Sequence, residues 1–218
     1  MSLDDVASPD RHVRILDAAE RCFARAGFHR TTMQDVAAEA QMSAGNLYRY
    51  FRSKDAIVAG LSERDRQEVA ADFTQAGAAM GFFEALEHLG RKHIVDAPRE
   101  KSIVLLEIWS EATRNPTVGA ACGAIDGELS TLLAAMVEAA KGSGQLPAEV
   151  DAHFACTVLF TMADGLFKRR ALDPEFDGER ELANAMAVFR AVFTGQVRPA
   201  REISPRDPSS TVSSEAPS

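Results

Sequence analysis

Cysteine, tryptophan and tyrosine are scarce in this 218-residue chain, which holds three, one and two of them respectively. The cysteines (Cys22, Cys122 and Cys156) are odd in number, far apart and set among apolar neighbours. This pattern favours buried thiols over a disulfide framework. No basic-then-apolar leader pattern is present, and charge-free apolar runs such as 154–163 fall short of the roughly 20 residues that cross a bilayer. We therefore expect a cytoplasmic protein that does not enter a membrane.

Signatures of enzymes and metal sites are also missing. The sequence has no H-E-x-x-H, C-x-x-C or G-x-S-x-G motif, no P-loop and no dinucleotide-binding glycine motif. The histidines lie far apart or out of helical phase: His12, His29, His88, His93 and His153. We expect no catalytic residue, no cofactor and no metal site, and an all-α enzyme stays open as an alternative.

The charge of the chain is unevenly distributed. The net charge is −8, which is unfavourable for a nucleic-acid ligand, yet residues 11–54 hold eight Lys or Arg against four Asp or Glu. Affinity for DNA comes largely from Lys and Arg that neutralise phosphates. A basic segment followed by an acidic remainder is typical of a DNA-binding protein with a second function.

Apolar residues recur at intervals of three and four, which predicts an all-α fold with about nine helices. The first helix, about residues 11–25, carries one continuous apolar stripe and ends at Gly27. N-cap signals then predict helices over about 32–39, over 43–50 and from 53: Thr32, Ser43 and Ser53. Five further helices are separated by breaks near residues 76–77, 96–98, 115–116, 142–147 and 173–178.

This organisation predicts two domains and a tail. Residues 1–54 are expected to form a three-helix DNA-binding domain, and residues 55–197 a helical domain for ligand binding and dimerisation. Residues 198–218 are rich in Pro, Ser, Thr and Glu. Such a composition cannot bury apolar area, so we expect this tail to be disordered.

The two short helices at 32–39 and 43–50 have the spacing of a helix-turn-helix, in which the first helix braces the second across the major groove. The apolar residues that would close its small core are Val36, Ala37, Ala40, Met42, Leu47 and Tyr50 or Phe51. The residues between them are then left to face outward. Small side chains at 43–45 would let the helix start approach phosphates closely.

These residues closely resemble the N-terminal signature of the tetracycline-repressor (TetR) family. The likeness lies in Thr31–Ala37 (TTMQDVA) and Ser43–Lys54 (SAGNLYRYFRSK) and spans roughly residues 11–60. Met162–Phe167 (MADGLF) adds a looser likeness. The resemblance implies a homodimeric repressor whose two recognition helices enter successive major grooves of a palindromic operator in double-stranded DNA. It also implies an inducer pocket in the C-terminal part.

The resemblance implies specific roles for residues of the helix-turn-helix. It places phosphate contacts at Thr32, Tyr48, Tyr50 and Lys54, and groove-facing positions at Ser43, Ala44, Gly45 and Asn46. At two positions this sequence departs from the family pattern. Gln41 stands where glycine is usual, and a left-handed conformation there costs on the order of 1 kcal/mol. Ala44 stands where a basic residue is frequent, so base readout would pass to Asn46, Arg49 and Gln34, with a thymine-methyl contact by Ala44.

The last two helices offer apolar faces for a dimer. In the helix of about 179–195 the face comprises Leu182, Met186, Phe189, Val192 and Phe193. In the helix of about 148–170 and just beyond it comprises Phe154, Val158, Thr161, Gly165 and Leu172. With their symmetry mates these faces could form a four-helix interface. The alternative, that they pack within one subunit, stays open.

A ligand pocket is expected where aromatic and isolated polar residues converge between helices. The candidates are Phe83, Leu86, His93, Leu105, Trp109, Phe160 and Phe167. Because these walls are apolar, the expected inducer is small and mostly apolar. Each residue could instead be plain core, and a DNA-binding protein controlled by a protein partner, without a small-molecule pocket, is the second alternative.

Overall fold

The computed structural model describes residues 9–199. In that range the chain forms nine α-helices, one π-helical turn and no strand, which confirms the all-α prediction. The predicted tail lies, from residue 200 onward, outside the described residues. The elements are α1 (Pro9–Ala26), α2 (Met33–Glu39), α3 (Ala44–Tyr50), α4 (Lys54–Ala79), α5 (Phe82–Gly90), the π-helical turn η1 (Arg91–Asp96), α6 (Arg99–Ala112), α7 (Pro116–Gly142), α8 (Ala152–Leu172) and α9 (Gly178–Phe193).

The first helices begin at the predicted caps. The Thr32 hydroxyl accepts a hydrogen bond from the N–H of Asp35, whose carboxylate accepts the N–H of Thr32 in return, which completes a capping box. Ser43 and Ser53 cap α3 and α4 in the same way, each by accepting an N–H from three residues further on. These caps satisfy backbone donors that a helix start otherwise leaves without partners.

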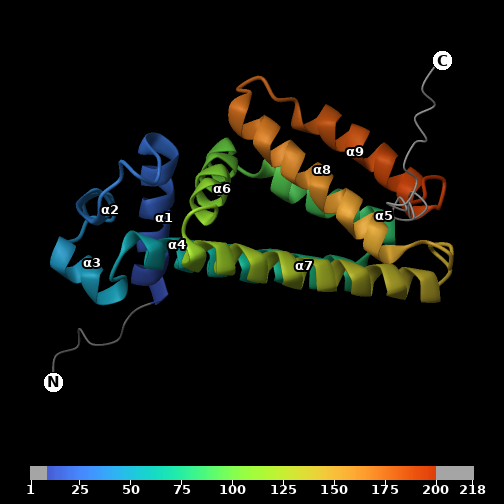
Figure 1. Ribbon diagram of the computed structural model, residues 1–218, viewed down its shortest axis with the longest axis horizontal. Coiled ribbons are helices and arrows are strands. Elements are labelled where there is room, and N and C mark those ends of the chain that lie inside the picture. Colours follow the sequence, from blue (N-terminus) through green and yellow to red (C-terminus); the bar gives the residue numbers. More distant parts are fainter. Residues whose placement is uncertain (1–8, 200–218) are drawn as a thin grey trace, which may run out of the picture.

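Helices α1–α3 and the start of α4 form the N-terminal bundle, at the left of Figure 1. Its core is a single apolar cluster in which Phe23 and Leu47 are almost fully buried. Val104 and Ile108 of α6 and Val118 of α7 belong to the same cluster. The N-terminal bundle is therefore packed against the rest of the subunit and is not suspended from a linker.

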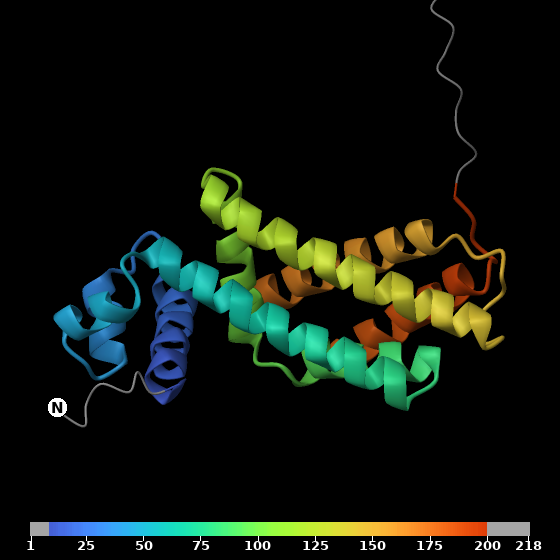
Figure 2. The same ribbon diagram turned by 90° about the horizontal axis from the view of Figure 1, so that it is seen from below.

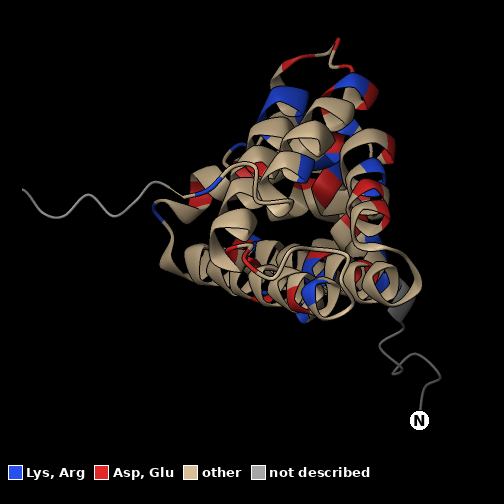
Figure 3. Ribbon diagram, turned by 90° about the vertical axis from the view of Figure 1, so that its right-hand side faces the viewer, with Lys and Arg blue, Asp and Glu red and all other residues tan. Residues whose placement is uncertain are grey.

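The remaining helices form the C-terminal bundle. Figure 2 shows α4 and α7 running side by side along one side of it, while α8 and α9 form a second layer above them in Figure 1. A second apolar cluster fills the space between these layers. Seen end-on in Figure 3, acidic and basic residues alternate over the helices of this bundle.

Helix α4 belongs to both bundles. Ile57, Val58 and Leu61 lie in the N-terminal cluster, whereas Phe73 and Ala76 lie in the C-terminal one. Its end at Ala79 is two to three residues beyond the predicted break at 76–77. A domain boundary at residue 54 stays a prediction, and the packing shows that α4 connects the two sides without interruption.

Helix α7 is long and apolar enough, by length and composition alone, to cross a membrane. Its four fully or nearly buried side chains, however, pack into the two clusters of the subunit. Contacts with α4, α6 and α8 flank the helix. These four residues therefore have a structural role within the bundle.

The apolar face predicted for dimer contacts on α9 lies inside the subunit, so this part of the prediction is wrong. All five of its residues are buried in the C-terminal cluster: Leu182, Met186, Phe189, Val192 and Phe193. Amphipathic periodicity identifies a buried face but not the chain that covers it. The α8 face of the predicted interface differs from the α9 face, because its residues Thr161 and Gly165 are exposed and Leu172 is 67% exposed.

Candidate DNA-binding surface and ligand cavity

Helix α3 presents an exposed face at one end of the molecule. Its Leu47 is fully buried and fixes the helix on the N-terminal core, while the next residue, Tyr48, is 50% exposed. Gly45 and Arg49 are also exposed, and Asn46, whose N–H donates to the Ser43 cap, is half-buried. Gly45, Tyr48 and Arg49 thus lie together on one outward surface of α3. Two other predicted contact residues, Ala44 and Tyr50, pack partly against the N-terminal cluster.

The turn between α2 and α3 contains the left-handed residue expected from the sequence. Gln41 has a φ of 54°, whereas the other left-handed positions in the described range are glycines. The N–H of Met42 donates to Ala37 O at 2.9 Å, and the N–H of Gln41 donates to Ala38 O at 3.0 Å. This pair of bonds is a Schellman motif, which closes α2 and sets the angle at which α3 departs.

The remaining predicted contact residues flank α3. Thr32 and Gln34 are exposed at the start of α2, although the Thr32 hydroxyl also donates to Asp35 at 2.7 Å. The ammonium of Lys54 donates to Phe28 O at 2.6 Å and to His29 O at 3.3 Å. Lys54 therefore anchors the turn after α1, a role that the sequence does not reveal.

The same turn is bound from the other side by α6. The N–H of Phe28 donates to Glu107 Oε2 at 2.8 Å, and His29 Nε2 lies 3.2 Å from Glu111 Oε2. Gly27 adopts a φ of 80°, and a side chain there would meet the Glu107 carboxylate. This turn is thus the point where α6 contacts the N-terminal bundle.

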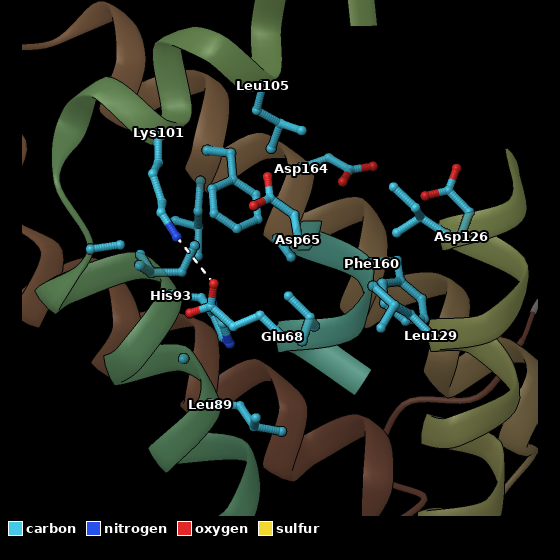
Figure 4. A pocket seen from close by; sticks show the side chains of 18 of the residues that line it. Asp65, Glu68, Leu89, His93, Lys101, Leu105, Asp126, Leu129, Phe160 and Asp164 are labelled. Carbon is cyan, nitrogen blue, oxygen red and sulfur yellow. Dashed lines mark hydrogen bonds and ion pairs between the residues drawn. The ribbon is translucent and has the colours of Figure 1, made fainter. Parts of the chain in front are cut away.

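A cavity of about 260 Å³ is lined by residues of α1, α4, α5, η1, α6, α7, α8 and α9. Six of the seven residues predicted for a ligand site line it: Leu86, His93, Leu105, Trp109, Phe160 and Phe167. Figure 4 shows Leu105, Phe160 and His93 around this space. Within the described residues the apolar walls of the expected pocket therefore enclose a real cavity.

Phe83 does not line the cavity, so its assignment to the ligand site is wrong. It packs edge-on against Phe82 and lies under the guanidinium of Arg190 at 4.6 Å from the ring centroid. The periodicity of α5 places Phe83 beside the buried face without showing that its ring points away from the cavity.

Carboxylates that sequence reasoning missed also line the cavity. They come from four helices and comprise Glu20 of α1, Asp65 and Glu68 of α4, Asp126 of α7 and Asp164 of α8. Figure 4 shows the last four. Burial raises the pKa of Asp65 despite the neighbouring Arg64, and it raises the pKa of Asp126. The pKa of Asp164 is raised by burial and by the charge of Asp126. No sequence motif links these residues, and each by itself is typical of a solvated helix face.

His93 lies on η1, where the predicted continuous helix widens into a π-helical turn. Its Nε2 is 3.0 Å from Asp72 Oδ2, yet burial lowers the pKa of the imidazole below its ordinary value. We therefore treat His93 as a neutral polar group of the cavity wall at neutral pH.

Comparison with known proteins identifies the family. Residues 15–61 match the family of bacterial regulatory proteins of the TetR type, and residues 84–194 match the C-terminal part of BetI-type transcriptional repressors. The chain belongs to the TetR family. Members of this family are transcriptional regulators that bind DNA through the helix-turn-helix, so the protein is a regulator and not an enzyme.

Relatives and solved structures agree with TetR membership. The transcriptional regulator UidR of Escherichia coli K12 is 25% identical over 160 residues, which cover 73% of this chain and 81% of UidR. The regulator FadR of Bacillus subtilis, solved with stearoyl-CoA, superposes with a TM-score of 0.72 at 20% identity over 84% of this chain and 98% of FadR. A regulator from Saccharomonospora viridis, solved with choline, superposes with a TM-score of 0.73 at 20% identity over 84% of this chain and 97% of that regulator.

Proposed function

We propose that this TetR-family protein is a homodimeric repressor that binds a palindromic operator and is released when a small molecule enters the cavity. The observation that carries the proposal is the connection between the two sites. The exposed α3 and the cavity lie at opposite ends of a chain of contacts through α4 and α6. As a DNA-binding regulator, the protein would act in the cytoplasm.

The DNA contacts divide into two kinds. Tyr48 and Tyr50 would donate to phosphate oxygens and orient the protein, and Lys54 would add a contact through a donor that its carbonyl partners leave open. Thr32 would join them by turning toward the phosphate the hydroxyl that otherwise donates to Asp35. Asn46, Arg49 and Gln34 would read base edges in the major groove, with Ala44 against a thymine methyl group. Ser43 and Gly45 would allow the close approach of the backbone.

The dimer would form through the outer faces of α8 and α9. Thr161, Gly165 and Leu172 are exposed on α8, and Val188 is 41% exposed on α9 beside the exposed residues Asn184 and Ala187. Small residues on both helices permit close packing against a symmetry mate. This interface keeps the predicted helices and replaces the α9 face that is buried in the subunit.

The cavity supports control by a small molecule over control by a protein partner alone. Its walls are mostly apolar, which fits a ligand with a mostly apolar body. Two fold neighbours were solved with small molecules. A ligand can release DNA only if it binds the non-binding conformation more tightly than the DNA-binding one.

The proposal is tested by selecting binding sites for the full-length protein from a pool of random DNA duplexes. We expect a palindrome, a protein mass on DNA of two chains per site, and affinity that falls steeply with salt. The matched control is a duplex of the same composition with one half-site scrambled, which should bind at least about 100-fold more weakly. A monomer in solution, or equal affinity for both duplexes, would refute the proposal.

A further inference from the structure

We propose that the ligand of the cavity is a small organic cation whose positive charge is held by Asp126 and Asp164. This inference rests on the proposed function and adds the chemical class of the ligand. The expected molecule has an apolar or aromatic body and one cationic group. The two carboxylates project from the facing helices α7 and α8 into the same part of the cavity (Figure 4).

Most other charges at the cavity wall already have partners. Glu20 accepts from Arg64 at 2.6 Å, and Asp65 Oδ1 lies 3.5 Å from Nε of the same guanidinium. Glu68 lies 3.5 Å from the ammonium of Lys101. Lys101 thus balances Glu68, whereas Glu20 and Asp65 share the single charge of Arg64, and Asp65 Oδ1 has no hydrogen-bond partner among the described residues.

Asp126 and Asp164 differ from these groups. In the described range, 9–199, neither carboxylate has an ion pair or a hydrogen bond, and only burial and their mutual repulsion act on them. Both residues are nevertheless exposed, so their carboxylates remain accessible to solvent. Two negative charges without a counter-charge thus remain on the α7–α8 side.

The cost of filling this cavity depends on the charge of the ligand. A neutral ligand would displace water from both carboxylates without replacing its hydrogen bonds, which is unfavourable for ionised groups. A cation would displace the same water, pair with both charges and remove their repulsion. Lys101 does not compete for this place because Glu68 holds its ammonium.

The aromatic walls suit the rest of such a ligand. Trp109 and Phe160 line the same cavity as the two carboxylates, and aromatic faces attract cations as well as apolar groups. Cationic and apolar recognition therefore coincide in one cavity. The neutral imidazole of His93 adds no opposing charge.

The test compares benzyltrimethylammonium with neopentylbenzene, its neutral isostere. Binding to the full-length protein is followed by the fluorescence of Trp109, the single tryptophan of the chain, which lines the cavity. We expect the cation to bind at least about tenfold more tightly than the isostere. D126N/D164N should lose this preference while its affinity for neopentylbenzene is unchanged or higher. E84Q/E149Q, which removes two exposed charges outside the cavity, should keep it.

Each result decides the matter. Equal affinity of the wild type for both probes, or a preference that persists in D126N/D164N, overturns the inference. D164N alone is the second variant, expected to lose part of the preference, and thermal melting verifies that each variant is folded. Operator binding is measured on the same samples. If the protein binds its operator but does not prefer the cation, the proposed ligand class is refuted and the proposed function is not. If the protein binds no operator, the proposed function is refuted.

Discussion

The backbone N–H of Phe28 and the side chain of Glu107 are 79 residues apart in sequence and joined by a 2.8 Å hydrogen bond. Phe28 follows α1 in the N-terminal bundle, and Glu107 lies on α6. On the same helix, Leu105 and Trp109 line the cavity. A displacement of α6 by a ligand would therefore act directly on the turn that precedes the helix-turn-helix.

Replacement of Glu107 by alanine should weaken this connection. The variant leaves the N–H of Phe28 without its partner, so we expect a loss of about 1–2 kcal/mol in the free energy of unfolding. The ligand-dependent change in operator affinity should shrink as well. Urea denaturation and operator titration with and without ligand measure the two effects. Glu107→Gln, which retains an acceptor oxygen, serves as the control, and an alanine variant as stable as the wild type would argue against the contact.

Replacement of Gln41 by glycine should stabilise the protein. The φ of 54° at this position is strained for glutamine and free of strain for glycine. After subtraction of the greater entropy of glycine in the unfolded chain, a gain on the order of 0.5 kcal/mol remains. Thermal unfolding measures it, and Gln41→Ala, which keeps the strain, should show no gain. A glycine variant less stable than the alanine variant would contradict this account of the turn.

Tyr48 and Asn46 should affect DNA binding in different ways. Because Tyr48 is assigned to phosphate, Tyr48→Ala should weaken binding to all duplexes by a similar factor. Asn46→Ala should chiefly reduce the difference between operator and mismatched sequence, by about 1–3 kcal/mol at one base pair. Competition titrations with single-base operator variants separate the two effects. Tyr48→Phe is the control for the hydroxyl, and equal loss of specificity at both positions would refute this assignment.

Charge on the exposed face of α9 should dissociate the dimer. Val188 is 41% exposed in the subunit, so Val188→Glu should leave the fold intact while it places a charge in the proposed interface. Sedimentation equilibrium should show a monomer with an unchanged helical circular dichroism spectrum. Val13→Glu adds the same charge on α1, where Val13 is 47% exposed, and should remain dimeric. A dimeric Val188→Glu protein would place the interface elsewhere.

Local signals in the sequence predicted the parts of the fold that depend on local physics. The caps at Thr32, Ser43 and Ser53 mark real helix starts because each side chain satisfies a backbone donor three residues away. Gly27 ends α1 with the left-handed conformation that its position required. These features involve neighbours in sequence, so no knowledge of the tertiary structure is needed to find them.

The features that sequence analysis missed depend on tertiary packing. The apolar faces of α9 and Phe83 were correctly seen as apolar, but their surroundings are set by helices distant in sequence. Asp126 and Asp164 were not predicted as cavity residues because their sequence surroundings do not distinguish them from solvent-exposed acids. An isolated acid on a helix is usually solvated, and only the packing of α7 against α8 places the two at one cavity.

The continuity of α4 has a mechanical consequence for the proposed dimer. Its 26 residues make a rod of about 39 Å at a rise of about 1.5 Å per residue. A tilt of only about 5° around its cavity end would then shift the opposite end by about 3 Å, calculated from the same helical rise. In a dimer the two α4 helices would move in directions related by the two-fold axis. The separation of the two recognition helices would then change by up to twice that distance, so that it would no longer match the spacing of successive major grooves.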